Sequence, residues 1–491
     1  MKRSIATVCL SGSLEQKLRA AAAAGFDGVE LFEPDLIASP LTPEQVRRLL
    51  AELGLTLDLY QPLRDFEAVP EPDLARADAK LALMQELGAG LLLVCSNVRE
   101  DALDDDELAA AQLRELAERA SRRGIRIAYE ALAWGRHVND YEHSLRIVER
   151  ADHPALGTCI DSFHVLSRGD LPRRLDRLFF VQLADAPRLD MGLLHWSRHH
   201  RCFPGTGGFD LDSFVAAVLA SGYTGPLSLE VFNDVFRATD PERTARDAMR
   251  SLRALDGSLP EAPELDGFAY VEVGGEPPFA HEAVRVVGGS GIEGFGVVSK
   301  DPERSARRAR ELGTSVGFGS ERTRIDHLTL ALPFDEAALE YRAALDLKPC
   351  SGEEVVSPDG LVHSRAYERD GVRLAFNAPV LNGHGPRLEH VAFACDDARA
   401  TARSLRADGI ALLDIPGNYY DDLEARWGID TGELRELGLL YDRDSEGGEL
   451  LHAFTRARGN VFFEVLERRG GYSGYGAANT PIRMAAQREE R

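Results

Sequence analysis

Four oxygen-bearing side chains end short apolar runs in the first half of this chain. They are Glu130, Asp161, Gln182 and Glu230. The carboxyl ends of the strands in a parallel barrel meet at one mouth, so these side chains could share one divalent cation. Carboxylate and amide oxygens without a thiolate favour Mg²⁺, Mn²⁺ or Co²⁺. Each residue alone could be a loop cap or an ion-pair partner, but four on separate runs predict a metalloenzyme.

Other residues near these runs suggest what the metal would do. His164 follows Asp161 by three residues, and histidine titrates near neutral pH and suits proton abstraction. It could instead be a hydrogen-bond partner of a ligand or a loop packing residue. Arg64 follows the third run, and Arg201 ends the basic, aromatic segment 195–201. Guanidinium groups bind carboxylates through paired hydrogen bonds, so the two arginines predict a small anionic substrate, unless they form surface ion pairs.

These side chains need a scaffold, and strand and helix patterns alternate up to about residue 255. Apolar runs lie at residues 4–10, 28–32, 56–61, 91–96, 126–131, 157–161, 179–183 and 226–232, and amphipathic stretches lie at 43–53, 73–87, 105–123 and 210–221. Glycines at 25, 54, 88, 124 and 222 follow helical stretches where a left-handed cap is needed. Eight such units predict a (β/α)8 TIM barrel. A doubly wound open sheet is less favoured, because no glycine-rich phosphate loop follows the first run.

Composition limits the partners and the compartment. The net charge of −23 disfavours nucleic acid and anionic membranes. The six cysteines are scattered without a CxxC pair, which fits a reducing cytoplasm. The chain begins with a strand rather than an apolar signal segment, and no apolar run has bilayer length. We therefore expect a soluble cytoplasmic protein, and we expect it to form a homo-oligomer.

The pattern changes after the barrel. We place the barrel at residues 1–257, a linker at 258–265 and a second, strand-rich α+β domain at 266–491. Two stretches there, 324–331 and 387–394, begin alike, and each is followed by a helical pattern, at 335–345 and 397–408, and by further strands. This repeat predicts a pair of βαβββ modules. Residues 266–320 look like a shortened partner module without a matching histidine.

The repeat carries a second set of candidate ligands. His327 and His390 occupy equivalent places in the two repeated strands, and Glu464 lies in a third strand-like run. Two histidines and one carboxylate can form a facial triad for Fe²⁺ or Mg²⁺ with open coordination positions. A solitary histidine in a strand is usually structural, but two at matched positions favour a second divalent metal.

Several segments of the first half resemble the bacterial 3-dehydroshikimate dehydratases, which belong to the xylose-isomerase-like barrel superfamily. The segments are 129–136, 161–164, 182–187, 195–201 and 228–233. The resemblance implies that Glu130, Asp161, Gln182 and Glu230 bind the metal, that His164 is the catalytic base, and that Arg64, Ser197 and Arg201 contact the substrate. The implied reaction is a metal-assisted elimination of water from 3-dehydroshikimate that yields protocatechuate.

Segments 416–423, 447–455 and 462–471 resemble 4-hydroxyphenylpyruvate dioxygenase, of the vicinal-oxygen-chelate fold. Fusion of such a module behind a dehydratase barrel is an arrangement known in this dehydratase family. His452 and Glu467 stand where the dioxygenase family usually has glutamine. We therefore expect a metal-binding fold without 4-hydroxyphenylpyruvate turnover.

Two other enzyme classes share parts of this pattern. A sugar isomerase or epimerase would use the same metal chemistry with a second acid/base group, for which Glu30 is a candidate. A dioxygenase would make the second half the main enzyme. Both halves predict open metal sites rather than exposed interaction surfaces, so a purely binding protein is the least favoured class.

Overall fold

The computed structural model describes residues 1–491 except 170, 332–337, 358–359, 380–387 and 490–491. Contacts divide the chain into two compact units, Met1–Leu259 and Pro260–Arg491. Among the described residues, no helix has both the length and the apolar character needed to cross a bilayer.

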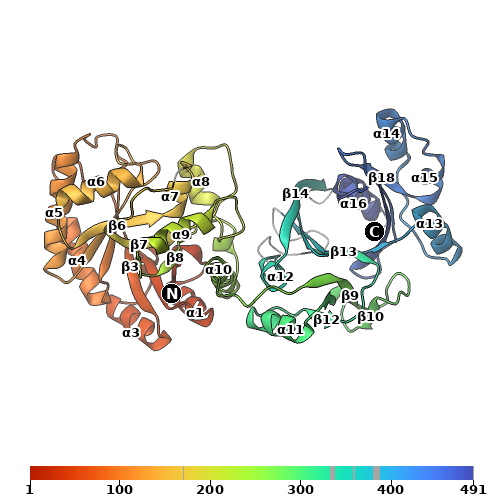
Figure 1. Cartoon of the computed structure of the whole chain (residues 1–491), viewed down its shortest axis with the longest axis horizontal. Helices are drawn as coiled ribbons and strands as arrows, with labels where there is room; N and C mark the ends of the chain where they lie inside the picture. Colours follow the sequence, from red (N-terminus) through yellow and green to blue (C-terminus); the bar gives the residue numbers. More distant parts are fainter. Residues whose placement is uncertain (170, 332–337, 358–359, 380–387, 490–491) are drawn as a thin grey trace. The chain divides into compact units, whose positions relative to one another are not determined.

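Unit 1 is a closed barrel of eight parallel strands in sequential order (Figure 1). The strands are β1 (Arg3–Ala6), β2 (Gly28–Phe32), β3 (Thr56–Leu63), β4 (Leu91–Cys95), β5 (Arg126–Glu130), β6 (Leu156–Asp161), β7 (Leu178–Leu183) and β8 (Leu227–Leu229). The predicted TIM barrel is thereby confirmed. The first strand is shorter than predicted, because the chain turns into a 3₁₀ helix at Thr7, whose hydroxyl accepts the N–H of Phe32.

Helices follow the strands of the barrel. They are α1 (Leu14–Ala23), α2 (Glu33–Ile37), α3 (Pro43–Leu53), α4 (Leu74–Leu87), α5 (Asp106–Ser121), α6 (Tyr141–Ala151), α7 (Ser162–Leu166), α8 (Leu193–His199), α9 (Leu211–Ala220) and α10 (Pro241–Leu255). Asp73, Asp105 and Asp210 cap α4, α5 and α9 by accepting a backbone N–H of the first turn. The five glycines predicted as left-handed caps have φ between 71° and 88°.

Strand register places the candidate ligands at one end of the barrel. Asp161 of β6 lies beside Gln182 of β7, and Glu130 of β5 lies beside Cys159 of β6. A buried cluster joins strands β3 to β7, and it contains Leu59, Leu91, Leu93, Cys95, Ala128, Leu132, Cys159 and Phe180. Packed apolar side chains of this kind hold the strand ends in fixed positions.

The described residues of unit 2 form two sheets. The smaller sheet has the order β10-β9-β11-β12, and the larger has the order β14-β15-β16-β13-β17-β20-β19-β18. The strands are β9 (Leu265–Gly274), β10 (Val284–Val287), β11 (Ile292–Ser299), β12 (Gly317–Gly319), β13 (Ile325–Ala331), β14 (Lys348–Ser357), β15 (Gly360–Arg369), β16 (Val372–Pro379), β17 (Glu389–Ala394), β18 (Leu440–Arg443), β19 (Glu449–Phe454) and β20 (Val461–Arg469). The two repeated strands, β13 and β17, are antiparallel neighbours in the middle of the larger sheet. Their matched histidines are thus brought close together.

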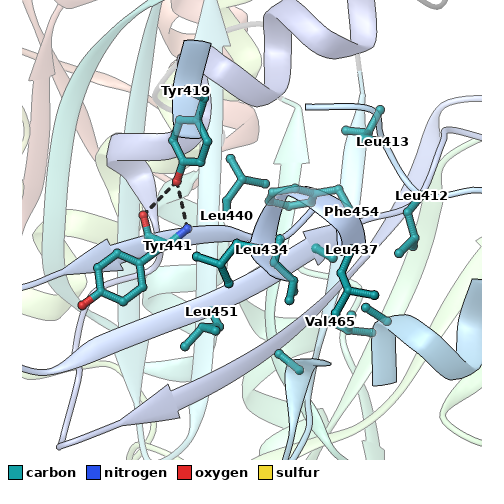
Figure 2. Close-up of a cluster of buried hydrophobic side chains, with 14 of the residues drawn as sticks. Leu412, Leu413, Tyr419, Leu434, Leu437, Leu440, Tyr441, Leu451, Phe454 and Val465 are labelled. Atoms are coloured by element: carbon teal, nitrogen blue, oxygen red, sulfur yellow. Dashed lines mark hydrogen bonds between the residues drawn. The ribbon is translucent and has the colours of Figure 1, made fainter. Parts of the chain in front are cut away.

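The helices of unit 2 are α11 (Pro302–Glu311), α12 (Ala338–Leu345), α13 (Ala398–Ala407), α14 (Gly417–Trp427), α15 (Gly432–Leu437) and α16 (Thr480–Glu489). Residues 335–337 of the helix predicted at 335–345 lie outside the described residues. Helices α13 to α15 pack on β18 to β20 through a buried hydrophobic cluster (Figure 2). Within it, the Tyr419 hydroxyl donates to the carbonyl of Tyr441 at 3.0 Å and accepts its N–H at 2.8 Å. The buried hydroxyl therefore has its partners.

Candidate functional sites

Three of the four predicted barrel ligands are buried carboxylates at strand ends. Glu130 ends β5, Asp161 ends β6 and Glu230 follows β8, and each is at most 5% exposed. Ligand atoms of Glu130, Asp161 and His164 all lie within 4.8 Å of one another. The barrel thus brings together side chains that are up to 100 residues apart in the sequence, and the geometry suits a cation bound by oxygen atoms.

Arg201 joins two of these carboxylates. Its Nη1 donates to Asp161 Oδ2 at 2.7 Å and to Glu230 Oε2 at 3.0 Å. Ser197 supports the guanidinium by accepting from Nη2 at 2.8 Å and from Nε at 3.1 Å. Burial opposes ionisation of Asp161, but Arg201 outweighs it and lowers the pKa of this carboxyl. Ser197 and Arg201 were both predicted to contact the substrate. In the structure, Ser197 hydrogen-bonds Arg201.

Glu130 has an oxygen suited to a cation. Its Oε2 accepts from the thiol of Cys95 at 3.3 Å, whereas Oε1 is buried and has no hydrogen-bond partner among the described residues. Burial, followed by the charges of Glu230 and Asp161, raises the pKa of Glu130 to about 8. A buried carboxylate oxygen without a partner is costly, and a bound cation would remove that cost.

Gln182, the fourth predicted ligand, contacts Glu30. Its Nε2 donates to Glu30 Oε2 at 2.6 Å, and its Oε1 accepts from the Cys159 thiol at 3.3 Å. Glu30 also accepts from Gln61 Nε2 at 2.7 Å and from the Ser228 hydroxyl. The amide oxygen of Gln182 keeps a second lone pair, as a metal ligand requires.

His164 lies beside the carboxylates with its two ring nitrogens in different surroundings. Nδ1 accepts the backbone N–H of Ala133 at 3.1 Å, and Nε2 lies 3.7 Å from Glu130 Oε1. Burial lowers the pKa of His164 to about 3, so the ring is neutral at pH 7. The guanidinium Nη2 of Arg201, which can only donate, lies 3.4 Å from Nε2, but the shorter contact from Ala133 places the proton of the neutral ring on Nε2. The predicted base role therefore requires the ring to give up its hydrogen bond from Ala133.

Three arginines border the same small cavity. Arg64, Arg198 and Arg201 line it together with Glu130, His164 and Glu230. The cavity volume is about 10 Å³. Arg198 was not predicted as a site residue, although it lies in the same basic segment, 195–201, as Arg201. Burial and the neighbouring Arg64 lower the pKa of Arg198. An anion bound here would compensate this concentration of positive charge.

Comparison with known proteins identifies the family. A model described as a xylose isomerase-like TIM barrel matches residues 18–255. A 3-dehydroshikimate dehydratase from Pseudomonas aeruginosa is 41% identical over an alignment that covers all of this chain and 99% of the relative. The chain belongs to the 3-dehydroshikimate dehydratase family. Its alignment with this dehydratase has 631 positions, so the relative contains segments that the 491-residue chain lacks.

Two further matches concern the combination of unit 1 and unit 2 in one chain. A solved xylose isomerase-like TIM barrel/4-hydroxyphenylpyruvate dioxygenase fusion protein superposes with a TM-score of 0.85 at 37% identity, with full coverage of both chains. A 4-hydroxyphenylpyruvate dioxygenase from Pseudomonas aeruginosa is 38% identical over 101 residues, which are 20% of this chain and 28% of the relative. Both resemblances predicted from the sequence are confirmed.

The second cluster of this dehydratase family member lies in unit 2. Glu464 Oε2 is 3.1 Å from His390 Nε2 and 3.4 Å from His327 Nε2, and all three side chains are buried. His452 donates from Nδ1 to the other carboxylate oxygen, Oε1, at 2.7 Å if Nδ1 carries the ring proton. Asp326 holds His327 from the far side, with Oδ1 2.9 Å from Nδ1. The three predicted ligands therefore converge, and their supporting contacts fix them as in metal sites.

The two unusual residues noted in the sequence have different surroundings. His452 contacts the carboxylate of Glu464 directly. Glu467 instead accepts the N–H of Ala398 at 3.0 Å and pairs with Arg469, so it caps a helix and does not contact the cluster through these bonds. Only the first substitution bears on the candidate metal centre.

Proposed function

We propose that unit 1 is a 3-dehydroshikimate dehydratase that eliminates water from its substrate with the help of a divalent cation. The observation that carries this proposal is the buried cluster of Glu130, Asp161 and Glu230, in which Glu130 Oε1 has no partner among the described residues. The full-length relative named 3-dehydroshikimate dehydratase supports the substrate. This similarity does not favour the isomerase or dioxygenase alternatives.

The residues fit a cation bound by oxygen atoms. When bound by the four predicted ligands, a divalent cation would act as a Lewis acid on the ketone and hydroxyl oxygens of the substrate. Arg201 Nη1 contacts the carboxylates of Asp161 and Glu230, two of the residues that would hold the cation. Pairing with Arg201 would therefore compete with cation binding for these carboxylates.

The remaining side chains bind the substrate and move a proton. Arg64, Arg198 and Arg201 provide donors for the ring carboxylate. His164 directs Nε2 toward Glu130 and Arg201, and we propose that it exchanges a proton with the substrate. With the ring proton on Nε2, the neutral ring can only donate a hydrogen bond, for example to the departing hydroxyl. As a base it must first lose the hydrogen bond from Ala133.

The test is a direct assay. Purified protein is mixed with Mg²⁺, Mn²⁺ or Co²⁺ and 3-dehydroshikimate, and protocatechuate is followed by absorbance. We expect product formation that stops on chelation and is lost in Glu130→Gln, whose side chain keeps its size but loses the charge. Absence of product with every divalent metal would refute the assignment.

We further infer that unit 2 binds a second divalent cation at His327, His390 and Glu464. His390 Nδ1 and Gln487 Nε2 are buried without hydrogen-bond partners among the described residues. Arg483 of α16 is also buried, and it stacks 5.0 Å from the ring centroid of Phe462, a ring that also packs against His390. Its Nη1 donates to Gln487, and no described carboxylate forms an ion pair with it.

Charge balance then suggests what this centre binds. Two neutral histidines, one glutamate and a divalent cation leave one positive charge, to which Arg483 adds another. Buried charges are rarely left without compensation, so we propose a small carboxylate as the ligand of unit 2. Calorimetry on the Mn²⁺-loaded protein, with pyruvate as the probe, tests this proposal. Binding that persists in Arg483→Met would contradict it, and Arg488→Met on the same helix is the matched control.

A further inference from the structure

Glu30 is a buried carboxylate that the proposed reaction does not use. It lies in β2, is 0% exposed, and does not line the small cavity next to Glu130 and His164. Three donors occupy its two oxygens. Gln61 and Gln182 both donate from Nε2 to Oε2, at 2.7 Å and 2.6 Å, and the Ser228 hydroxyl donates to Oε1. Each oxygen of this carboxylate therefore already accepts at least one hydrogen bond from a neighbouring side chain.

The contacts of Glu30 fix the orientation of the Gln182 side-chain amide. The Oε2 atom of Glu30 acts only as an acceptor for the two amides, whether or not the other oxygen carries a proton. Gln182 must therefore present its nitrogen to Glu30 and its oxygen to the opposite side. If the amide turned over, two oxygens would face each other in a buried site, which is unfavourable. Cys159 adds to this preference, because its thiol donates to the amide oxygen.

We infer that Glu30 is a positioning residue that keeps the oxygen of Gln182, and not its nitrogen, available to the cation of unit 1. The inference rests on the metal site proposed above. Glu30 also holds Gln61, which lines the small cavity together with Glu230. One buried carboxylate thus orders a predicted ligand and a second side chain that borders the site, and its role differs from the acid/base role that an epimerase would need.

The test compares two substitutions that both remove the charge. In Glu30→Gln the new amide oxygen can still accept from Gln61 and Gln182, and its NH₂ can donate to Ser228. In Glu30→Met no acceptor remains. Mn²⁺ binding is measured by electron paramagnetic resonance of the free ion, and the component that belongs to unit 1 is the one removed by Glu130→Gln. We expect Glu30→Met to bind this Mn²⁺ about tenfold or more weakly than Glu30→Gln.

Three other outcomes would contradict the inference. Equal Mn²⁺ affinity in the two variants would overturn the inference. So would a Glu30→Gln protein that keeps its Mn²⁺ but loses turnover, because Glu30 would then act as an acid or base. If Glu130→Gln removes no Mn²⁺ component, the proposed metal site is wrong and the inference falls with it.

If Glu30→Met is unable to fold, its circular dichroism spectrum will show it. In that case, exchanging the glutamate and glutamine at positions 30 and 182 tests the same contact. Gln182→Glu places two carboxylates in contact, whereas Glu30→Gln combined with Gln182→Glu restores a donor and an acceptor with their places exchanged. We expect the double variant to bind Mn²⁺ more tightly than Gln182→Glu alone. Effects that simply add would mean that the two residues do not act through their contact, which would overturn the inference.

Discussion

The guanidinium of Arg201 lies against the carboxylate of Asp161, with Nη1 2.7 Å from Oδ2 and both side chains almost fully buried. Arg201 thus contacts a predicted metal ligand. It is also one of the three arginines proposed to bind the substrate carboxylate. Its two roles can be separated by experiment.

We expect Arg201→Met to leave Mn²⁺ affinity unchanged or raised, because the competitor for Asp161 and Glu230 is gone. The value of kcat/KM should fall about 100-fold or more, since a buried charge-assisted contact to the substrate is lost. Metal titration and steady-state kinetics measure the two effects, and Arg122→Met, at an exposed position, is a control. Loss of Mn²⁺ binding with an unchanged KM would contradict this role.

Metal binding should release a proton from Glu130 below pH 8. The raised pKa of about 8 means that the carboxyl is protonated at pH 6.5 and ionised at pH 9. Calorimetry in buffers of different ionisation enthalpy should show about one proton released at the lower pH and almost none at the higher. Glu130→Gln should abolish the buffer dependence, and its persistence there would assign the proton to another group.

The same shift predicts how stability depends on pH before metal is added. The folded-state pKa of Glu130 lies above its ordinary value of 4.5, so its contribution is fully present below about 4.5 and is lost as the pH rises through 8. Thermal unfolding of chelated protein between pH 6 and 9 should therefore show falling stability, and added Mn²⁺ should reduce the fall. A stability that rises over this range would contradict the shift.

His164→Gln separates a role of His164 as a hydrogen-bond donor from a role as the base. With the ring proton on Nε2 and Nδ1 accepting from Ala133, we expect turnover to fall about 100-fold or more. Exchange of the substrate proton next to the ketone with D₂O should persist, because another group removes it. Nuclear magnetic resonance follows the exchange. If exchange and turnover are lost together, His164 is the base that the sequence predicted.

Asp185 should be a strong determinant of stability in unit 1. Its buried carboxylate accepts the N–H groups of Ala186, Gly205, Gly207 and Phe209 at 2.8 to 3.0 Å. Asp185→Ala removes all four bonds, and we expect the free energy of unfolding to fall by about 2–4 kcal/mol. Urea denaturation measures the loss. The exposed Asp190→Ala nearby should change stability by less than about 0.5 kcal/mol, and equal effects would refute the role of Asp185.

Local sequence pattern determined the architecture of unit 1 and the approximate place of its site. Apolar runs, capping aspartates and glycines with positive φ mark the strands and helices through interactions within a few residues, so they can be read without knowing the fold. The rule that parallel strand ends meet then placed Glu130, Asp161 and Glu230 together. The matched positions of His327 and His390 in a repeat did the same for unit 2.

Only the tertiary structure decided what each side chain contacts. Glu30 meets Gln182 across 152 residues and Ser228 across 198 residues, and such pairs depend on strand register and rotamers that no local pattern encodes. The tautomer of His164 depends on the N–H of Ala133, which comes from another strand end. Sequence supplied the donors and acceptors, but hydrogen bonds act over about 3 Å, so their pairing required the folded barrel.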